Sequence, residues 1–185
     1  MASLPNSKTV TYEEWLRMPE VSDAREEVVN GEIRIMPAPK WNRGEIVENI
    51  QFALLSQLDR RAFRVKVTLF GLIIRKSPLT SREPDLAVFD MSTIVEQDGY
   101  IHSAPQLLVE VLSPANTRRE REEKLADYAA IGVPEVWVVS PEARNVEVLY
   151  LENGALRTGQ ILAAGTLTPK LFPQVTVDIA RIWPD

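Results

Sequence analysis

Two carboxylates stand in or beside strongly apolar stretches of the chain. Glu110 lies within residues 107–112, Leu-Leu-Val-Glu-Val-Leu, and Asp85 immediately precedes a second apolar run at residues 86–89. Burying an ionised carboxylate is costly, so a cation such as Lys124, a metal ion or a strand end open to water must compensate Glu110. Two carboxylates that enter a sheet core from neighbouring strands suit Mg²⁺, which binds one or two carboxylates together with water and phosphate oxygens. The pair indicates phosphoryl-transfer chemistry.

Each carboxylate also has a structural interpretation. Glu110 can belong to an ion pair that only stabilises the fold, since such networks also hold buried carboxylates. Asp85 can serve as a turn residue that bonds nearby backbone, a common use of Asp at a strand boundary. Residue types and spacing leave both interpretations open.

Lys124 lies on a helix predicted over residues 117–131. Thr117 and Glu120 form a capping box at its start, and Gly132 and a following proline end it. Lys124 and Tyr128 are one turn apart at the edge of the apolar stripe, so the lysine stem can be buried while its ammonium reaches inward. The arginines of the same helix are interpreted as a solvated, salt-bridged face.

A basic segment interrupts an otherwise acidic chain. Residues 57–82 carry a net charge of +6, whereas the whole chain carries −5. The segment can bind phosphate, and it can equally be a charged edge strand that resists aggregation.

Composition excludes several other chemistries. The chain has no Cys and a single histidine, His102, so disulfides, Cys-ligated metals, cysteine nucleophiles and multi-histidine metal sites are ruled out. Neither GxGxxG nor GxxxxGK[ST] occurs, so a nucleotide cofactor has no support. No apolar stretch approaches the ~20 residues of a membrane span, and residues 1–8 do not resemble a secretory signal. We therefore expect a cytoplasmic protein with no membrane partner.

The pattern of elements predicts an α/β (α+β) fold, with a mixed central β-sheet flanked by helices. Residues 107–112, the helix at 117–131 and a strand at 136–139 resemble a crossover unit with two parallel strands. We expect one domain over residues 1–185 with a short arm at residues 1–8. The other predicted elements are a short helix within 9–18, a hairpin at 26–36, a helix at 45–58, a strand at 63–74 bent near Gly71, and strands at 84–89, 146–151 and 156–162.

Several sequence blocks together resemble a known family. They are Glu-Val-Val-Asn-Gly-Glu at 27–32, Glu-Pro-Asp-Leu-Ala-Val at 83–88, Pro-Gln-Leu-Leu-Val-Glu-Val-Leu-Ser-Pro at 105–114, and the segment from Lys124 to Trp137. In this order they resemble the Uma family of bacterial restriction endonucleases, within the PD-(D/E)XK nuclease superfamily. The resemblance covers nearly the whole chain and implies a restriction-endonuclease-like core.

The resemblance also implies roles for particular residues. Asp85 and Glu110 match the metal-binding acids, and the backbone carbonyl of Val111 matches a further ligand. Leu112 stands where the superfamily motif has its lysine, and Lys124 on the following helix matches the displaced lysine of the Uma pattern. Glu27 matches an early acid that orients the lysine or a metal-bound water. Asn42 and Arg43 stand where Uma sequences often have a histidine.

The implied activity is metal-dependent hydrolysis of nucleic-acid phosphodiester bonds, most simply those of DNA, with Mg²⁺ or else Mn²⁺. The ion activates a water and offsets charge on the phosphate, while Lys124 positions or helps deprotonate the nucleophile. Cutting both strands of a duplex favours a homodimer. Two other hypotheses stay open: a nuclease-fold interaction module without turnover, and a phosphoesterase acting on small substrates.

Overall fold

The computed structural model describes residues 9–19, 25–36, 41–67, 70–114 and 116–184. Within these ranges the strands form two six-stranded sheets and a two-stranded one. The arm predicted at residues 1–8 lies outside the described residues. None of the helices in the described ranges is both long and apolar enough to cross a membrane.

The central sheet has the strand order β12-β11-β10-β9-β6-β3. Strands β9 and β10 are parallel, and the other neighbouring pairs are antiparallel. The sheet is therefore mixed, and β9 lies in its interior, as predicted from its unbroken apolar run. The bounds of its strands are β3 Phe63–Val67, β6 Leu86–Asp90, β9 Leu107–Val111, β10 Glu135–Ser140, β11 Asn145–Glu152 and β12 Ala155–Leu162.

A second sheet, which the sequence did not predict, has the order β2-β1-β5-β4-β8-β7. Its strands β1 and β2 are the predicted hairpin, with Asn30 and Gly31 at positive φ in the turn. The bounds of its strands are β1 Arg25–Val29, β2 Glu32–Met36, β4 Leu72–Lys76, β5 Leu79–Arg82, β7 Glu96–Gln97 and β8 Tyr100–Ile101.

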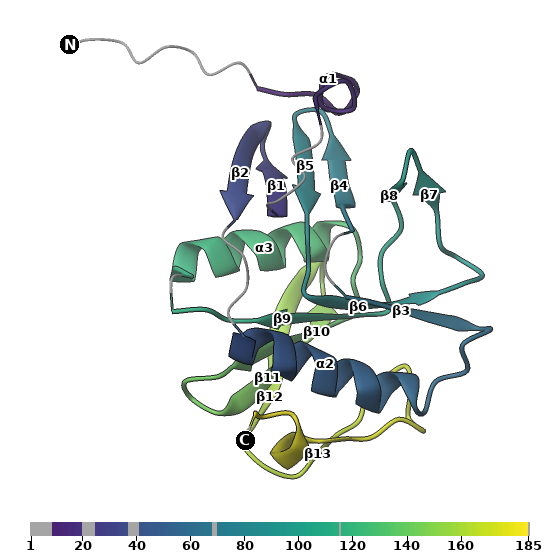
Figure 1. Ribbon diagram of the computed structural model, residues 1–185, viewed down its shortest axis with the longest axis vertical. Coiled ribbons are helices and arrows are strands. Elements are labelled where there is room, and N and C mark those ends of the chain that lie inside the picture. The colour runs from purple at the N-terminus through teal and green to yellow at the C-terminus, as the bar shows by residue number, and fades with distance from the viewer. Residues whose placement is uncertain (1–8, 20–24, 37–40, 68–69, 115, 185) are drawn as a thin grey trace.

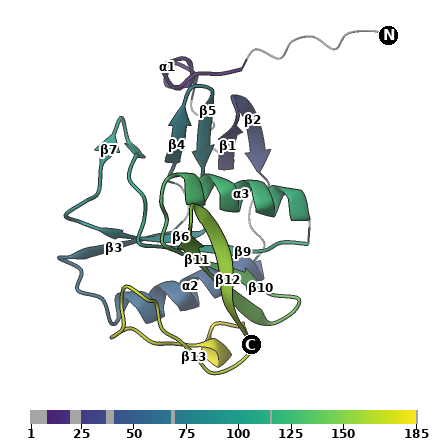
Figure 2. The same cartoon turned by 180° about the vertical axis from the view of Figure 1, so that it is seen from behind.

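Helices α2 and α3 cover opposite faces of the central sheet (Figures 1 and 2). Alternating side chains of β9 pack on the two faces: Val109 lies in the apolar core that contains α2 residues, and Leu108 in the core that contains Tyr128 of α3. Helix α3 lies between the central sheet and the second sheet (Figure 1). The remaining bounds are α1 Tyr12–Trp15, α2 Trp41–Leu55, α3 Arg118–Ala130, β13 Thr166–Leu167, β14 Val177–Asp178 and the 3₁₀ helix Ile179–Arg181.

The position of α3 follows from its end signals. The Thr117 side chain accepts from the backbone N–H of Glu120, and the Glu120 side chain accepts from the N–H of Thr117, so the predicted capping box is present. Gly132 after the helix has φ +86°, a conformation in which a side chain would be strained. These caps fix which residues face the sheet, and Tyr128 is fully buried as expected.

Two predicted elements differ from the structure. The single bent strand predicted at residues 63–74 is replaced by two strands in different sheets, β3 at Phe63–Val67 and β4 at Leu72–Lys76. Helix α2 begins at Trp41, four residues before the predicted start, so it also includes Arg43, and it ends at Leu55, three residues before the predicted end. The apolar spacing that predicted this helix reports only its buried face, and the first turn has no buried apolar residue.

Candidate active site

The register of two antiparallel strands brings the two carboxylates together. Leu86 of β6 pairs with Val109 of β9, and one further step of this register places Asp85 opposite Glu110. Opposite residues of an antiparallel pair have their side chains on the same face. Both carboxylates therefore leave the central sheet on the face covered by α3, and both are buried.

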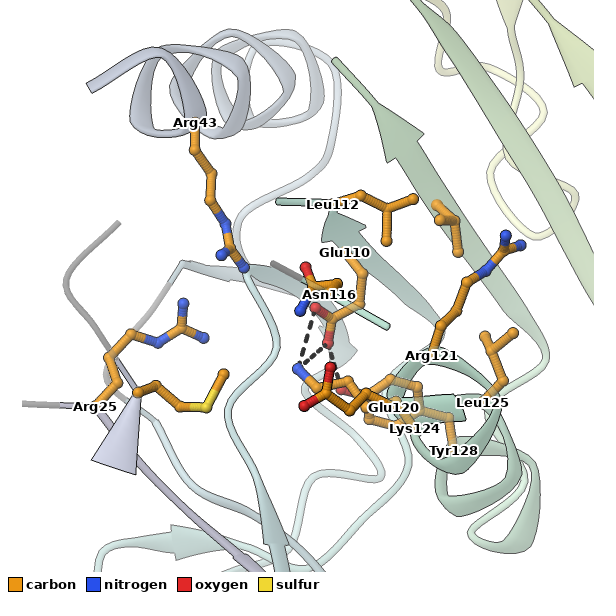
Figure 3. A pocket seen from close by; sticks show the side chains of 12 residues that line it. Arg25, Arg43, Glu110, Leu112, Asn116, Glu120, Arg121, Lys124, Leu125 and Tyr128 are labelled. Carbon is orange, nitrogen blue, oxygen red and sulfur yellow. Dashed lines mark hydrogen bonds and ion pairs between the residues drawn. The ribbon is translucent and has the colours of Figure 1, made fainter. Parts of the chain in front are cut away.

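Glu110 is compensated by a cation and a hydroxyl from α3. Lys124 Nζ lies 3.3 Å from Oε1 and 3.4 Å from Oε2 of Glu110. The Tyr128 hydroxyl donates a short hydrogen bond to Oε1 of the same carboxylate. Figure 3 shows Lys124 and Tyr128 projecting from the helix towards Glu110. The lysine proposed from sequence as the compensating cation is thus in contact with it.

Glu27 on β1 holds the other side of Lys124. Its Oε1 lies 2.9 Å from Lys124 Nζ, and its Oε2 accepts from Arg82 Nη1 at 2.9 Å. Arg82 Nη2 in turn lies 2.6 Å from a carboxylate oxygen of Asp127 on α3. Arg82 and Glu27 are each only 2 % exposed. This ion-pair network links the second sheet to α3 and leaves Lys124 between two carboxylates.

Asp85 is surrounded by donors. Arg43 Nη2 lies 2.6 Å from both carboxylate oxygens, Arg25 Nη1 lies 3.2 Å from Oδ1, and the backbone N–H of Val111 donates to Oδ2 at 2.8 Å. Asp85 is 1 % exposed. Val111 contacts Asp85 through its amide, so a role for its carbonyl as a metal ligand stays a prediction.

The surroundings shift the pKa values of this cluster in opposite directions. Burial raises the pKa of Glu110, and the negative charges of Asp85 and Glu27 raise it further, although Lys124 acts against them. Burial also disfavours ionised Glu27, but Lys124 and Arg82 outweigh it and lower the pKa of that carboxyl. For Lys124, burial lowers the pKa, yet Glu110 and Glu27 outweigh it and raise the value above the usual one. Lys124 is therefore a firmly protonated ammonium at neutral pH.

A pocket opens beside this cluster, between α2, β1 and α3. Its wall includes Arg25 and Arg43 on one side and Glu110, Lys124 and Tyr128 on the other (Figure 3). Leu112 also lines the pocket. Lys124 of α3 and Leu112, the residue that follows β9, thus border the same space.

The structure brings together the five residues singled out from sequence: Glu27, Asp85, Glu110, Val111 and Lys124. Sequence reasoning missed the two guanidinium groups on Asp85. Arg43 was noted only as standing where a histidine is common, and Arg25 gave no signal because neither spacing nor composition shows how far a long side chain reaches. The Tyr128 contact to Glu110 was also missed, although its helical spacing from Lys124 placed the ring on the same face.

The donor set fits a magnesium ion only in part. Within the described ranges no three Asp, Glu, His or Cys side chains gather closely enough to form a ligand cluster. Asp85 and Glu110 are two neighbouring carboxylates, and Mg²⁺ is usually bound by one or two carboxylates with water completing its shell. The residues fit such an ion provided that the groups now bonded to their oxygens can move.

Comparisons with known proteins agree with this architecture. A crystal structure of a putative nuclease belonging to DUF820 from Anabaena variabilis ATCC 29413 matches with a TM-score of 0.76 and 21 % identity, covering 94 % of this chain and 97 % of that one. At this identity the similarity shows a common fold. No curated protein matches the sequence. Residues 12–180 match the family Uma2, described as "Putative restriction endonuclease". The chain therefore belongs to the Uma2 family of nucleases, as its sequence blocks indicated.

Proposed function

We propose that this protein is a metal-dependent endonuclease that hydrolyses phosphodiester bonds in DNA. The observation that carries the proposal is the placement of Asp85 and Glu110 on one face of the sheet, with Lys124 against Glu110 at the wall of an open pocket. Two adjacent carboxylates can hold a divalent cation, and a lysine beside them can balance the charge of a phosphodiester under attack. Membership of a nuclease family supports the reaction class.

Asp85 and Glu110, with the Val111 carbonyl, would hold Mg²⁺ or Mn²⁺, which when bound polarises phosphate oxygens and acidifies water. Lys124 stays protonated between its two carboxylates, so its ammonium balances charge on the scissile phosphate and orients the attacking water. Glu27 acts through Lys124 as a positioning residue, since it accepts from Nζ at 2.9 Å and is itself fixed by Arg82.

A row of cations supports nucleic acid as the substrate. Arg64 and Lys66 on edge strand β3 are exposed, and the structure gives neither of them an ion-pair partner among the described residues. Arg64 and Lys66 pair in register with Phe89 and Ala87 of β6. Because side chains two residues apart in a strand lie on the same face, these residues lie on the face that also bears Asp85. By contrast, Arg82, counted with the same basic segment, is buried in the Glu27 network. The exposed row therefore runs along the sheet edge on the face that bears the carboxylates.

Arg64→Ala is expected to weaken binding to a DNA duplex and to reduce the slope of log affinity against log salt by about one, the loss of one phosphate contact. Fluorescence anisotropy in EDTA over a range of salt concentrations measures both quantities without cleavage. Arg157→Ala is the matched control, because Arg157 is an exposed arginine on β12, the opposite edge of the same sheet. If the two substitutions weaken DNA binding equally, Arg64 contributes only through the net charge of the protein and not through a phosphate contact at β3.

The test of the proposed function is cleavage of supercoiled plasmid by the purified protein in Mg²⁺ and then in Mn²⁺, with EDTA as the metal-free control. Glu110→Gln is expected to abolish nicking, because the amide keeps the shape of the side chain and loses its charge. Glu135→Gln controls for changing a buried carboxylate, since Glu135 is 1 % exposed but bonds Trp137 and the backbone of Lys170 instead. It should nick at the wild-type rate.

Nicking at the wild-type rate by an identically purified, folded Glu110→Gln protein would contradict the assignment of this site. No cleavage with either metal, in a folded protein that still binds DNA, would favour the interaction module. Cleavage of small phosphodiesters but not of plasmid would favour the phosphoesterase. Two sites related by a two-fold axis can cut both strands of a duplex at one place, so we expect the active species to be a homodimer, which sedimentation of the same preparation tests.

A further inference from the structure

Asp85 is bonded to two guanidinium groups that are held in very different ways. Arg25 is 7 % exposed, and besides Asp85 it bonds both the side chain and the backbone carbonyl of Glu83. Arg43 has a side chain that is 18 % exposed, and in the described part of the chain its guanidinium bonds Asp85 alone. Arg25 is thus built into the fold, whereas Arg43 has a single anchor.

The Arg43 guanidinium is also incompletely satisfied where it lies. Its Nε–H is buried and has no hydrogen-bond partner, although a buried donor without an acceptor costs free energy. Both of its contacts with Asp85 use the same nitrogen, Nη2, rather than the two-nitrogen fork that makes an arginine–carboxylate pair strongest. The pairing is close, but it is less stable than the geometry of arginine allows.

The place that Arg43 occupies is the place that a divalent cation would need. Its Nη2 lies 2.6 Å from both oxygens of Asp85. Each of these oxygens also accepts one further hydrogen bond, from Arg25 or from the Val111 amide. A second effect acts in the same direction, since two guanidinium charges beside one carboxylate repel a further cation. Arg43 therefore opposes metal binding at Asp85 by occupancy and by charge.

We propose that Arg43 is a built-in competitor of the divalent cation, which must displace it from Asp85 before the site can act. The inference rests on the proposed function, because that function places the cation at Asp85. Arg43 already lines the pocket and its Nε–H has no partner among the described residues, and phosphate oxygens are natural acceptors for a guanidinium that is freed from Asp85. Arg43 thereby raises the concentration of divalent cation that is needed to fill the site. When no cation is bound, it balances the negative charge of Asp85.

The test measures Mn²⁺ binding to the DNA-free protein, using the electron paramagnetic resonance signal of free Mn²⁺ as the readout. Arg43→Ala is expected to bind Mn²⁺ about 10- to 100-fold more tightly than the wild type, the range that corresponds to a lost charged hydrogen bond. Arg43→Met, which keeps an unbranched apolar stem in the pocket, should behave alike and covers the case in which the alanine variant folds poorly. Arg157→Ala removes the same charge from an exposed strand and should leave the affinity unchanged.

Adding Asp85→Asn to Arg43→Ala should abolish the gain, which places it at Asp85. An unchanged or weaker Mn²⁺ affinity in both Arg43 variants overturns the inference alone, because plasmid cleavage by the wild type can still establish the nuclease. Tight binding that survives Asp85→Asn also overturns it. If neither the wild type nor the Arg43 variants bind Mn²⁺, the inference and the metal requirement of the proposed function fail together.

Discussion

Lys124→Ala is expected to lower the rate of metal-dependent plasmid cleavage by at least about 100-fold, the usual effect of removing one preorganised electrostatic group. The reason is geometric: Lys124 is the only described cation paired with Glu110, and its contact with Glu27 fixes the direction of Nζ. Cleavage is measured by the loss of supercoiled plasmid under single-turnover conditions. Arg119→Ala is the control on the same helix, because Arg119 is 88 % exposed and its ion-pair partner among the described residues is Glu123 rather than a carboxylate of the site.

The same substitution carries a pH signature that separates a loss of chemistry from a loss of fold. Lys124 lowers the pKa values of Glu27 and Glu110, so its removal raises both in the folded state. A carboxyl whose pKa is higher in the folded protein than in the unfolded chain destabilises the fold at high pH. This destabilisation disappears once the pH falls below the pKa of the unfolded chain, about 4.3. We expect a deficit of about 1–3 kcal/mol at pH 7 that shrinks as the pH falls toward 4. Urea unfolding at several pH values measures it.

A Lys124→Ala protein that cleaves at more than about a tenth of the wild-type rate would contradict the role given to this lysine. If the loss of unfolding free energy in Lys124→Ala does not change with pH, Lys124 does not stabilise the ionised forms of Glu27 and Glu110. The two readouts can fail separately, since one reports the reaction and the other reports the ion pairs.

Trp137→Ala is expected to lower the free energy of unfolding by about 3–5 kcal/mol, the usual cost of deleting a large buried aromatic ring. Trp137 is fully buried in the core on the α2 face of the central sheet. Its Nε1–H also donates to the buried carboxylate of Glu135 at 2.7 Å, so the variant leaves a cavity and removes one donor from that carboxylate. For a chain of this size each kcal/mol corresponds to roughly 2–4 °C in Tm.

Trp41→Ala is the matched control for this prediction. Trp41 is 80 % exposed at the start of α2, so its removal should change stability by no more than about 0.5 kcal/mol. Trp137→Phe helps to apportion the two contributions, because it keeps a six-membered aromatic ring in the core and loses the pyrrole ring together with its hydrogen bond to Glu135. An alanine variant as stable as the wild type would mean that the core around β10 is not packed as described.

Local signals in the sequence predicted the elements that carry the site. The capping box and the terminal glycine gave α3 within a residue at each end, and the apolar run gave β9 as an interior strand. These signals depend on residues close together in the chain. They were enough to place Glu110 in a strand and Lys124 on the inner side of the next helix.

The second sheet could not be predicted as a sheet, because the pairings that join its hairpins, β1 with β5 and β4 with β8, connect segments that are distant in the chain. Strand β5 reads Leu-Thr-Ser-Arg, a polar sequence typical of a loop, yet all four residues are buried. Arg82 is buried because Glu27 and Asp127 compensate it, a condition that appears only once β1, β5 and α3 are assembled. Tertiary compensation of charge therefore hid both this strand and the arginines around Asp85.

The chain passes from the second sheet to the central one between Arg82, the last residue of β5, and Leu86, the first of β6. Asp85 lies within this crossing, and Arg25 of β1 bonds both Asp85 and Glu83 there. The ion pairs among Arg25, Glu83 and Asp85 consequently connect the two sheets, and they also form part of the candidate site. Local unfolding that separates the second sheet from the central sheet would disrupt the site while the central sheet stays folded. We therefore expect catalytic activity to be lost at a lower temperature or denaturant concentration than the one at which the whole protein unfolds.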